Sequence, residues 1–300
     1  MENSFIGNTM NMDTSFDDAK LTGTFNLTYT VTLPDEQLDP LVHYHDCFEL
    51  VFYVSADIQA YIDETHYHLV SKDVLIIPPR KMHKIIYPEH QNYVRYVLYF
   101  TPDHIERFFD PDMASKAVHL FKDRPYRKVS LSVPEYMRIN NLFKNMYEHR
   151  RALTAHNLAL LNAYSALILQ ELYLIFDRRP SLPPETGEMS PVDQVLKYIN
   201  AHYSEPIALE TLAEEFYLNK SYLCRLFHKT MGISIINYLQ HKRILEAQQL
   251  LLNSSRSIID ISMECGFSNI QHFYRVFKKV TALTPAEYKN HHSAIKPSQK

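Results

Sequence analysis

Three histidines and one glutamate in the N-terminal half carry the side chains best suited to hold a ligand. His43 and His45 are two residues apart, and Glu49 lies four residues beyond His45. Because side chains alternate between the faces of a β-strand, this spacing puts all three on one face. With His83 they make three imidazoles and a carboxylate, a set that could hold Fe, Mn, Ni or Zn. We favour the alternative, polar lining of a small-molecule site without metal, and predict no cofactor.

A second set of chemically suited residues recurs near the C-terminus. The segments 212–229 and 261–279 begin 49 residues apart and align with one extra residue in the second copy. Each copy reads as a short helix, a tight turn and a second helix, the pattern of a helix-turn-helix. An arginine follows the same apolar pattern in each second helix, Arg225 in one copy and Arg275 in the other. Gly266 is expected to end the first helix of the second copy, and Ser268 to cap the next helix.

The outward side chains of these second helices are residue types that read DNA. Early outward positions of such a helix reach base edges in the major groove, where Arg, Asn and Gln suit contacts to purines. Lysines more often meet phosphates. The predicted DNA-binding residues are Lys220, Ser221, Tyr222, Cys224, Arg225, Lys229, Ser268, Asn269, Ile270, Gln271, His272, Tyr274, Arg275 and Lys278.

Two kinds of element must position these residues. Residues about 21–130 read as short strands rich in Val, Ile, Tyr and Phe, which favours an antiparallel barrel or sandwich. Residues about 134–177 read as helical, with two apolar stripes that need two neighbours, the barrel and a partner subunit. The stripe predicted for dimerisation is Leu161, Tyr164, Ile168, Leu172 and Ile175.

The C-terminal part reads as helical from Ser190 onward. Helix-start signals recur at Ser190, Ser257 and Thr284, each followed three residues later by an acidic residue. An unbroken helical stretch at 235–252 would span about 26 Å and separate the two helix-turn-helix units. Four prolines between residues 178 and 191 indicate a linker. We therefore expect an arm at 1–20, a sensing domain at 21–177, a linker at 178–190, a DNA-binding domain at 191–292 and a tail at 293–300.

Charge and composition agree with this division. Residues 1–189 carry 18 basic and 25 acidic side chains, a net −7, whereas residues 190–300 carry 13 and 9, a net +4. A basic segment beside an acidic one suits a phosphate-binding module joined to a module with another task. The three distant cysteines oppose a disulfide framework. No apolar run of membrane-spanning length occurs, so we expect a cytoplasmic protein with no membrane partner.

The stretch CGFSNIQHFYRVFKKVTALTPAEYK at residues 265–289 resembles the signature of the AraC/XylS-type transcription regulators. The chain departs from that pattern at Ser262, Ala282 and Lys289, where the family usually has Ala, Gly and Arg. Ile270 stands where some relatives place a polar base reader, which suits a thymine methyl group instead. The N-terminal half is similar to the family's cupin-like sensing domain through HYHDCFEL, DVLIIPP and His83, and the His–Glu set copies the spacing of metal-binding cupins.

The resemblance implies a two-domain α+β protein. Its N-terminal domain would be a cupin-like antiparallel β-barrel with a helical dimerisation segment, and its C-terminal domain all-α with two helix-turn-helix units joined by a long helix. It implies a sequence-specific regulator, not an enzyme, that binds double-stranded DNA as a homodimer, with RNA polymerase as a candidate partner. The effector would be a sugar or related carbon source, contacted by His43, His45, Glu49, Arg80, His83 and Arg95.

Two rival readings remain open at this point. The first is a metal-dependent cupin enzyme with an appended helical domain, which depends on the three histidines and Glu49 alone. The second is a DNA-binding regulator controlled by a partner protein rather than by a metabolite. Metal content and a thermal-shift screen against metabolites would distinguish these readings, because a specific ligand raises the melting temperature.

Overall fold

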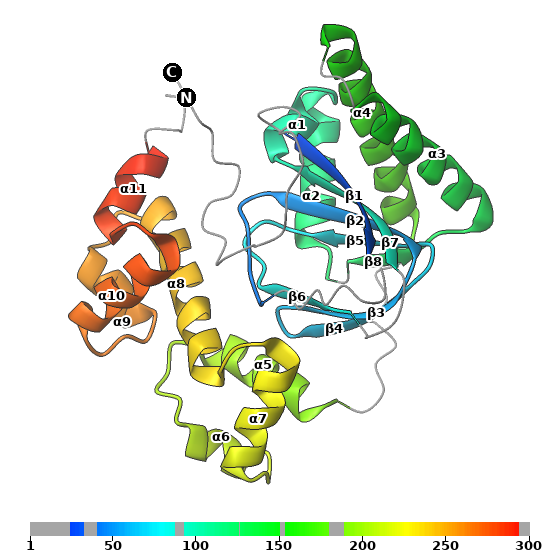
Figure 1. Ribbon diagram of the computed structural model, residues 1–300. Helices are drawn as coiled ribbons and strands as arrows, with labels where there is room; N and C mark the ends of the chain where they lie inside the picture. Colours follow the sequence, from blue (N-terminus) through cyan, green and yellow to red (C-terminus); the bar gives the residue numbers. More distant parts are fainter. Residues whose placement is uncertain are drawn as a thin grey trace. The chain divides into compact units, whose positions relative to one another are not determined.

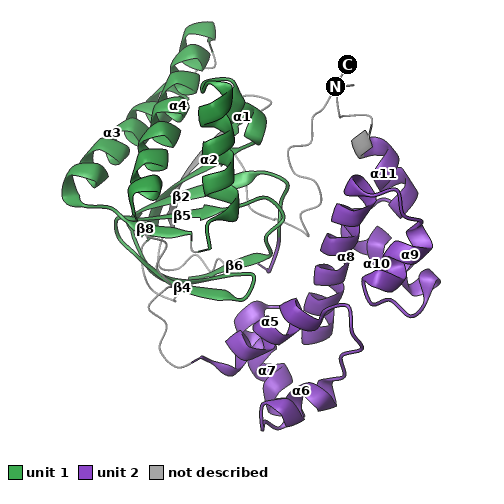
Figure 2. Cartoon of the chain, turned by 180° about the vertical axis from the view of Figure 1, so that it is seen from behind, with its two compact units in different colours: residues 1–6, 12–39, 44–187 green, residues 7–11, 40–43, 188–300 purple. Residues whose placement is uncertain are grey.

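The computed structural model describes residues 25–32, 41–87, 93–125, 127–150, 154–179 and 189–293. The chain divides into two compact units (Figure 2). The first contains residues 1–6, 12–39 and 44–187, and the second contains residues 7–11, 40–43 and 188–300. The predicted arm at 1–20, most of the predicted linker and nearly all of the predicted tail lie outside the described residues.

The first unit contains two antiparallel sheets (Figure 1). The order of the five-stranded sheet is β1 (Phe25–Thr32), β7 (Tyr93–Phe100), β2 (Phe48–Ser55), β5 (Asp73–Ile77) and β8 (Lys128–Ser130). The order of the three-stranded sheet is β4 (Thr65–Val70), β3 (Asp57–Ile62) and β6 (His83–Ile86). The predicted antiparallel β architecture is confirmed. Among the described strands no ladder joins the two sheets, so they form two layers rather than a closed barrel.

Strand alternation gives the five-stranded sheet two buried faces. On β2, Leu50 and Phe52 point into a core shared with the helices of this unit. Val51 and Tyr53 point the other way, into a core shared with the three-stranded sheet. A strand buried on both faces explains why FELVFYV is almost continuously apolar rather than alternating.

Four helices complete the first unit: α1 (Pro102–Glu106), α2 (Pro111–Asp123), α3 (Val133–His149) and α4 (Ala155–Arg178). The last two match the predicted helical segment. The first two correct the assignment of residues 21–130 to strands alone. Pro102 and Pro111 each stand at a helix start, where a missing N–H is tolerated, and the Asp110 side chain accepts from the backbone N–H groups of the second helix.

The predicted dimerisation stripe of α4 lies mainly in the core of its own unit. Leu161, Ile168, Leu172 and Ile175 are buried there, and Tyr164 is partly buried against the same core. By length and composition α4 is also apolar enough to cross a membrane. It packs against α2 and α3, as the core helix of a folded domain does.

The second unit is helical. Its helices are α5 (Pro191–His202), α6 (Leu209–Glu215), α7 (Lys220–Met231), α8 (Ile235–Asn253), α9 (Ile258–Glu264), α10 (Ile270–Thr281) and α11 (Pro285–Ser293). The long helix α8 contacts α7, α9, α10 and α11, and α7 and α10 lie near its opposite ends (Figure 1). Its 19 residues span about 28 Å, which confirms the predicted connecting helix.

The three predicted helix starts of the second unit are confirmed by their hydrogen bonds. The Ser190 hydroxyl accepts from the Asp193 backbone N–H at 3.2 Å, and the Asp193 carboxylate accepts from the Ser190 N–H at 2.7 Å. Ser257 accepts in the same way from the Asp260 N–H at 3.1 Å. Thr284 and Glu287 form a reciprocal pair like that of Ser190 and Asp193. These caps satisfy N–H groups that have no partner within a helix.

Candidate functional site

The first helix-turn-helix consists of α6, a turn at 216–219 and α7. Tyr217 has a positive φ of 54°, and the Leu218 N–H donates to the Ala213 carbonyl at 2.8 Å, which closes the end of α6. The Asn219 side chain then accepts from the backbone N–H groups of Ser221 and Tyr222 and begins α7. The turn therefore places the start of α7 at the surface.

The second helix-turn-helix consists of α9, a turn at 265–269 and α10. Gly266 has a φ of 81°, as predicted, and the Phe267 N–H donates to the Ser262 carbonyl at 3.0 Å. The predicted cap is wrong by one residue. Asn269, not Ser268, caps α10, because its side-chain oxygen accepts from the His272 N–H at 2.9 Å. The same residue type thus caps both second helices.

Both second helices turn a polar face outward. Arg225 and Arg275 are exposed, while Leu223, Phe227, Phe273 and Phe277 are buried beneath them. Lys220 is exposed and forms an ion pair with Glu210. Of the other predicted DNA-binding residues, Cys224, Ile270 and His272 are half-buried, whereas the exposed ones are Ser221, Tyr222, Lys229, Ser268, Asn269, Gln271, Tyr274 and Lys278.

A contact that the sequence analysis missed links α8 and the loop after α5 to the turn of the second helix-turn-helix. From α8, Arg243 donates to the carbonyls of Tyr203 and Glu205 at 2.6 and 2.7 Å. The same guanidinium lies 5.7 Å from the ring centroid of Phe267, in the second turn. We call Arg243, the loop 203–205 and residues 266–267 the Arg243 joint. No sequence signal indicates it, since its parts are 23 to 64 residues apart.

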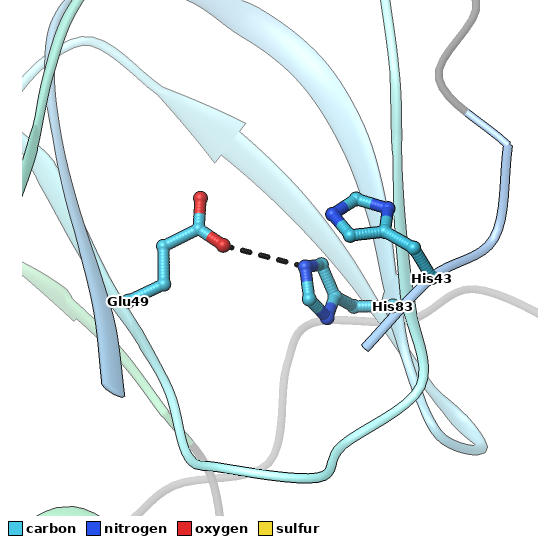
Figure 3. A group of neighbouring side chains, drawn as sticks. All are labelled: His43, Glu49 and His83. Atoms are coloured by element: carbon cyan, nitrogen blue, oxygen red, sulfur yellow. Dashed lines mark ion pairs between the residues drawn. The ribbon is translucent and has the colours of Figure 1, made fainter. Parts of the chain in front are cut away.

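A compact polar group lies where the sequence analysis placed the effector. We call His43, His45, Glu49 and His83 the histidine cluster. The Nε2 atoms of His45 and His83 lie 2.9 and 3.3 Å from the same Oε2 of Glu49. One ligand atom each from His43, Glu49 and His83 lie within 4.8 Å of one another (Figure 3). The structure thus brings together four of the six predicted effector residues.

The charges within this cluster depend on its hydrogen bonds. Burial lowers the pKa of His45, but hydrogen bonds to Cys47 and Glu49 outweigh it and raise the pKa to about 10. Burial raises the pKa of Glu49, yet hydrogen bonds from His45 and His83 hold that pKa well below its usual value. Without another cation, therefore, a protonated His45 and an ionised Glu49 form a buried pair.

The two predicted arginines lie in different surroundings. Arg80 has a positive φ of 62° and donates to the Asp46 carboxylate at 2.6 Å. Arg95 pairs in register with Tyr53 of β2, whose side chain faces the layer between the sheets. In the same ladder Tyr99 stands opposite Glu49, and burial together with the Glu49 charge raises the pKa of Tyr99 well above its usual value. Tyr99 was missed because only the strand pairing reveals it.

The chain matches two models of known protein families. Residues 33–162 match the AraC-like ligand binding domain, and residues 212–291 match a helix-turn-helix domain. RhaR of Escherichia coli K12, an HTH-type transcriptional activator, is 24% identical over 253 residues, 83% of this chain and 86% of that protein. YdiP of the same organism, an uncharacterized HTH-type transcriptional regulator, is 36% identical over 98 residues, 33% of this chain and 32% of that protein.

The chain is also similar to solved structures. The DNA-binding domain of the global transcriptional factor AdpA, in complex with a target DNA, is 27% identical to this chain. The match covers 37% of this chain and 99% of that one, with a TM-score of 0.35.

Proposed function

The chain is a DNA-binding transcription regulator of the AraC/XylS family with an AraC-like ligand-binding domain, and we propose that it reads a specific operator through α7 and α10 under the control of a small molecule. The observation that carries the proposal is the equivalent, exposed placement of Arg225 and Arg275 on two helices that are capped alike. An exposed arginine at the same position in both copies suits bidentate contact with a guanine in each of two major grooves.

DNA selection tests this proposal directly. Purified protein is incubated with a random duplex library, and the bound sequences are read. We expect a site with two conserved elements about one helical turn apart, because each recognition helix reads one major groove. Enrichment of no sequence, or of a single short element, would contradict reading by both helices.

The proposed effector site is the histidine cluster with Arg95, Tyr53 and Tyr99 on the same face of the five-stranded sheet. Imidazole, carboxylate, guanidinium and phenol groups are suited to hydrogen-bond the hydroxyls of a sugar or related carbon source. A thermal-shift screen tests the effector class, since a specific ligand raises the melting temperature by mass action. Stabilisation by no metabolite, together with intact operator binding, would favour control by a partner protein.

We still propose a homodimer, but through a different surface from the one that the sequence predicted. Four of the five residues predicted for dimerisation are buried within the chain itself. The large apolar side chains that α3 and α4 leave exposed are Val133, Met137 and Leu167. Sedimentation of the Leu167→Glu variant, compared with the natural protein, tests whether this surface holds a partner subunit.

Regulation rather than catalysis is favoured by RhaR, a regulator that aligns over 83% of this chain. We infer that the protein acts in the cytoplasm, where its DNA would be, and that RNA polymerase is a partner if the protein activates. Transcription in a purified system with the selected operator tests that partnership, because an activator raises transcript yield and a repressor lowers it.

A further inference from the structure

Two polar side chains of the first unit lie opposite each other on neighbouring strands. Tyr53 of β2 and Arg95 of β7 are paired in register, so their side chains leave the same face of the five-stranded sheet. Tyr53 is 0% exposed, and within the described part of the chain neither its hydroxyl nor the Nε of Arg95 has a hydrogen-bond partner. Burying a donor without an acceptor destabilises the folded state, so this pair points to an acceptor from outside the chain.

The charges on this face leave Arg95 without a counter-charge among the described residues. Glu49 is paired with the protonated His45 at 2.9 Å. Asp73 is 0% exposed and lies 3.4 Å from the Nζ of Lys128. The described strands of the facing sheet place no carboxylate in this layer. Their buried side chains there are Ile58, Ala60, Ile62, Tyr67, Leu69 and Ile85.

An aromatic ring, rather than an ion pair, orients the guanidinium of Arg95. Its central carbon lies 4.8 Å from the ring centroid of Tyr87, which in turn packs against the ring of Tyr93 at 5.1 Å. Stacking of this kind covers the flat face of a guanidinium and leaves the N–H groups at its edge able to donate. That edge matches the two oxygens of a carboxylate.

The hydroxyl of Tyr53 is a second donor at the same place. Burial raises the pKa of Tyr53 well above its usual value, although the Arg95 charge acts in the opposite direction. The phenol therefore keeps its proton at neutral pH and can donate it to an anion. A neutral donor beside a cation gives a site with one net positive charge, which a carboxylate balances and a dianionic phosphate exceeds.

We propose that Arg95 and Tyr53 bind the carboxylate of the effector, which is then a small organic acid such as a sugar acid rather than a neutral sugar. Glu49 and Tyr99 stand four residues further along the same two strands and on the same face, where they suit the hydroxyls of such an acid. This inference rests on the proposed effector site and specifies the chemical class of its ligand.

Removal of the phenol hydroxyl tests the site without any ligand. In carboxylate-free buffer, Tyr53→Phe should leave the melting temperature of the full-length protein unchanged or raise it, because the lost hydroxyl has no partner. The matched control is Tyr67→Phe. Tyr67 is buried in the same layer, but its hydroxyl accepts from the Arg127 backbone N–H at 3.3 Å, so this variant should lower the melting temperature. An equal loss in Tyr53→Phe would overturn the proposal, since its hydroxyl would then be satisfied already, for example by an ordered water.

Acetate, the probe for a carboxylate, tests the binding itself. At about 0.1 M and constant ionic strength, acetate should raise the melting temperature of the natural protein by about 2 °C more than that of Arg95→Met. Acetamide, which is neutral and of similar shape, should show no such difference, and inorganic phosphate a smaller one. Tyr53→Phe should lose part of the acetate effect, and it replaces Arg95→Met if circular dichroism shows that the latter does not fold. Equal acetate shifts in the natural protein and the variant, or a difference as large with acetamide or phosphate, would overturn the proposal.

Operator binding measured on the same samples separates this inference from the proposed function. A protein that selects its operator but shows no acetate difference defeats only the carboxylate site. A protein that shows the acetate difference but selects no operator defeats only the reading of DNA.

Discussion

The two helix-turn-helix units place their glycines at opposite ends of the same motif. Each unit needs a left-handed residue in the turn and another after the second helix. In the first unit these are Tyr217 and Gly232, with φ of 54° and 76°. In the second unit they are Gly266 and Ala282, with φ of 81° and 59°. Each copy therefore has one glycine where the conformation costs little and one larger residue where it is strained.

Packing explains the difference at the turns. Tyr217 is 95% exposed, so its side chain meets little. A Cβ at Gly266 would lie 2.7 Å from the Ser204 carbonyl oxygen and 3.0 Å from the guanidinium carbon of Arg243. The second turn packs against the loop after α5, while the Tyr217 side chain of the first turn faces solvent. In the first turn only the left-handed conformation favours glycine. In the second turn the lack of space for a Cβ atom favours glycine as well.

The largest expected effect tests this contrast at the turns. Gly266→Ala should destabilise the protein by about 3 kcal/mol, because it adds left-handed strain to a clash with backbone atoms. Tyr217→Gly, the matched change in the first copy, should alter stability by less than about 1 kcal/mol. Thermal and chemical unfolding measure both. Equal small effects would show that the second turn is not held against the loop.

The next effect compares the two recognition helices. Arg225→Ala and Arg275→Ala should each weaken operator binding by about 1–3 kcal/mol and relax base preference at one element. Arg256→Ala is the control, because Arg256 is exposed in the same unit and pairs with Glu264. Gel-shift titration on the selected operator gives the affinities. If one of the two substitutions leaves operator affinity unchanged, only one of the two copies reads DNA.

A smaller effect tests the ends of the second helices. Ala282→Gly should stabilise the protein by about 1 kcal/mol, because glycine removes the left-handed strain after α10. Gly232→Ala should destabilise it by a similar amount after α7. The double variant should resemble the natural protein in chemical unfolding. A destabilising Ala282→Gly would indicate that the alanine methyl group contributes packing that outweighs the strain.

The smallest effect concerns a histidine of α8 influenced by the second copy. Burial, with a smaller contribution from the Lys279 charge, lowers the pKa of His241 to about 4 from 6.5. The unfolded chain therefore binds the proton more readily, so this contribution to stability is present above pH 6.5 and is lost as the pH falls toward 4. Between pH 7 and 6 the loss should be about 0.7 kcal/mol. The free energy of unfolding is measured at both pH values for the natural protein and for His241→Gln, and the difference between the two losses gives the contribution of His241. Equal losses in the two proteins would contradict the prediction.

Local signals in the sequence predicted most of the second unit. The helix starts at Ser190, Ser257 and Thr284, the left-handed Gly266 and the long α8 each depend on a few neighbouring residues. The cap at Asn269 was misplaced by one residue, because Ser268 and Asn269 are both good caps and only the hydrogen bond decides between them. The Arg243 contacts could not be predicted, because they join segments that are distant in sequence.

The first unit was predicted less completely for a related reason. The spacing of His43, His45 and Glu49 indicated a shared face, and the structure gathers these residues with His83. The helices α1 and α2 were read as part of the strand region. Strand pairing, which sequence alone does not reveal, places Tyr99 opposite Glu49 and divides the strands into two sheets. Arg80 shows the same limit, since only the structure reveals that its side chain forms an ion pair with Asp46.

The Arg243 joint has a consequence for the operators that this protein can use. One added base pair between the two elements of a site moves the second element by about 3.4 Å and turns it by about 35° around the duplex axis. A flexible hinge between the two motifs would let the second recognition helix follow this shift of the DNA element. The two hydrogen bonds from Arg243 to backbone carbonyls and the close packing of Gly266 oppose such a movement. We therefore expect the protein to bind operators whose two elements have one fixed spacing. Natural sites should vary in base sequence far more than in this spacing.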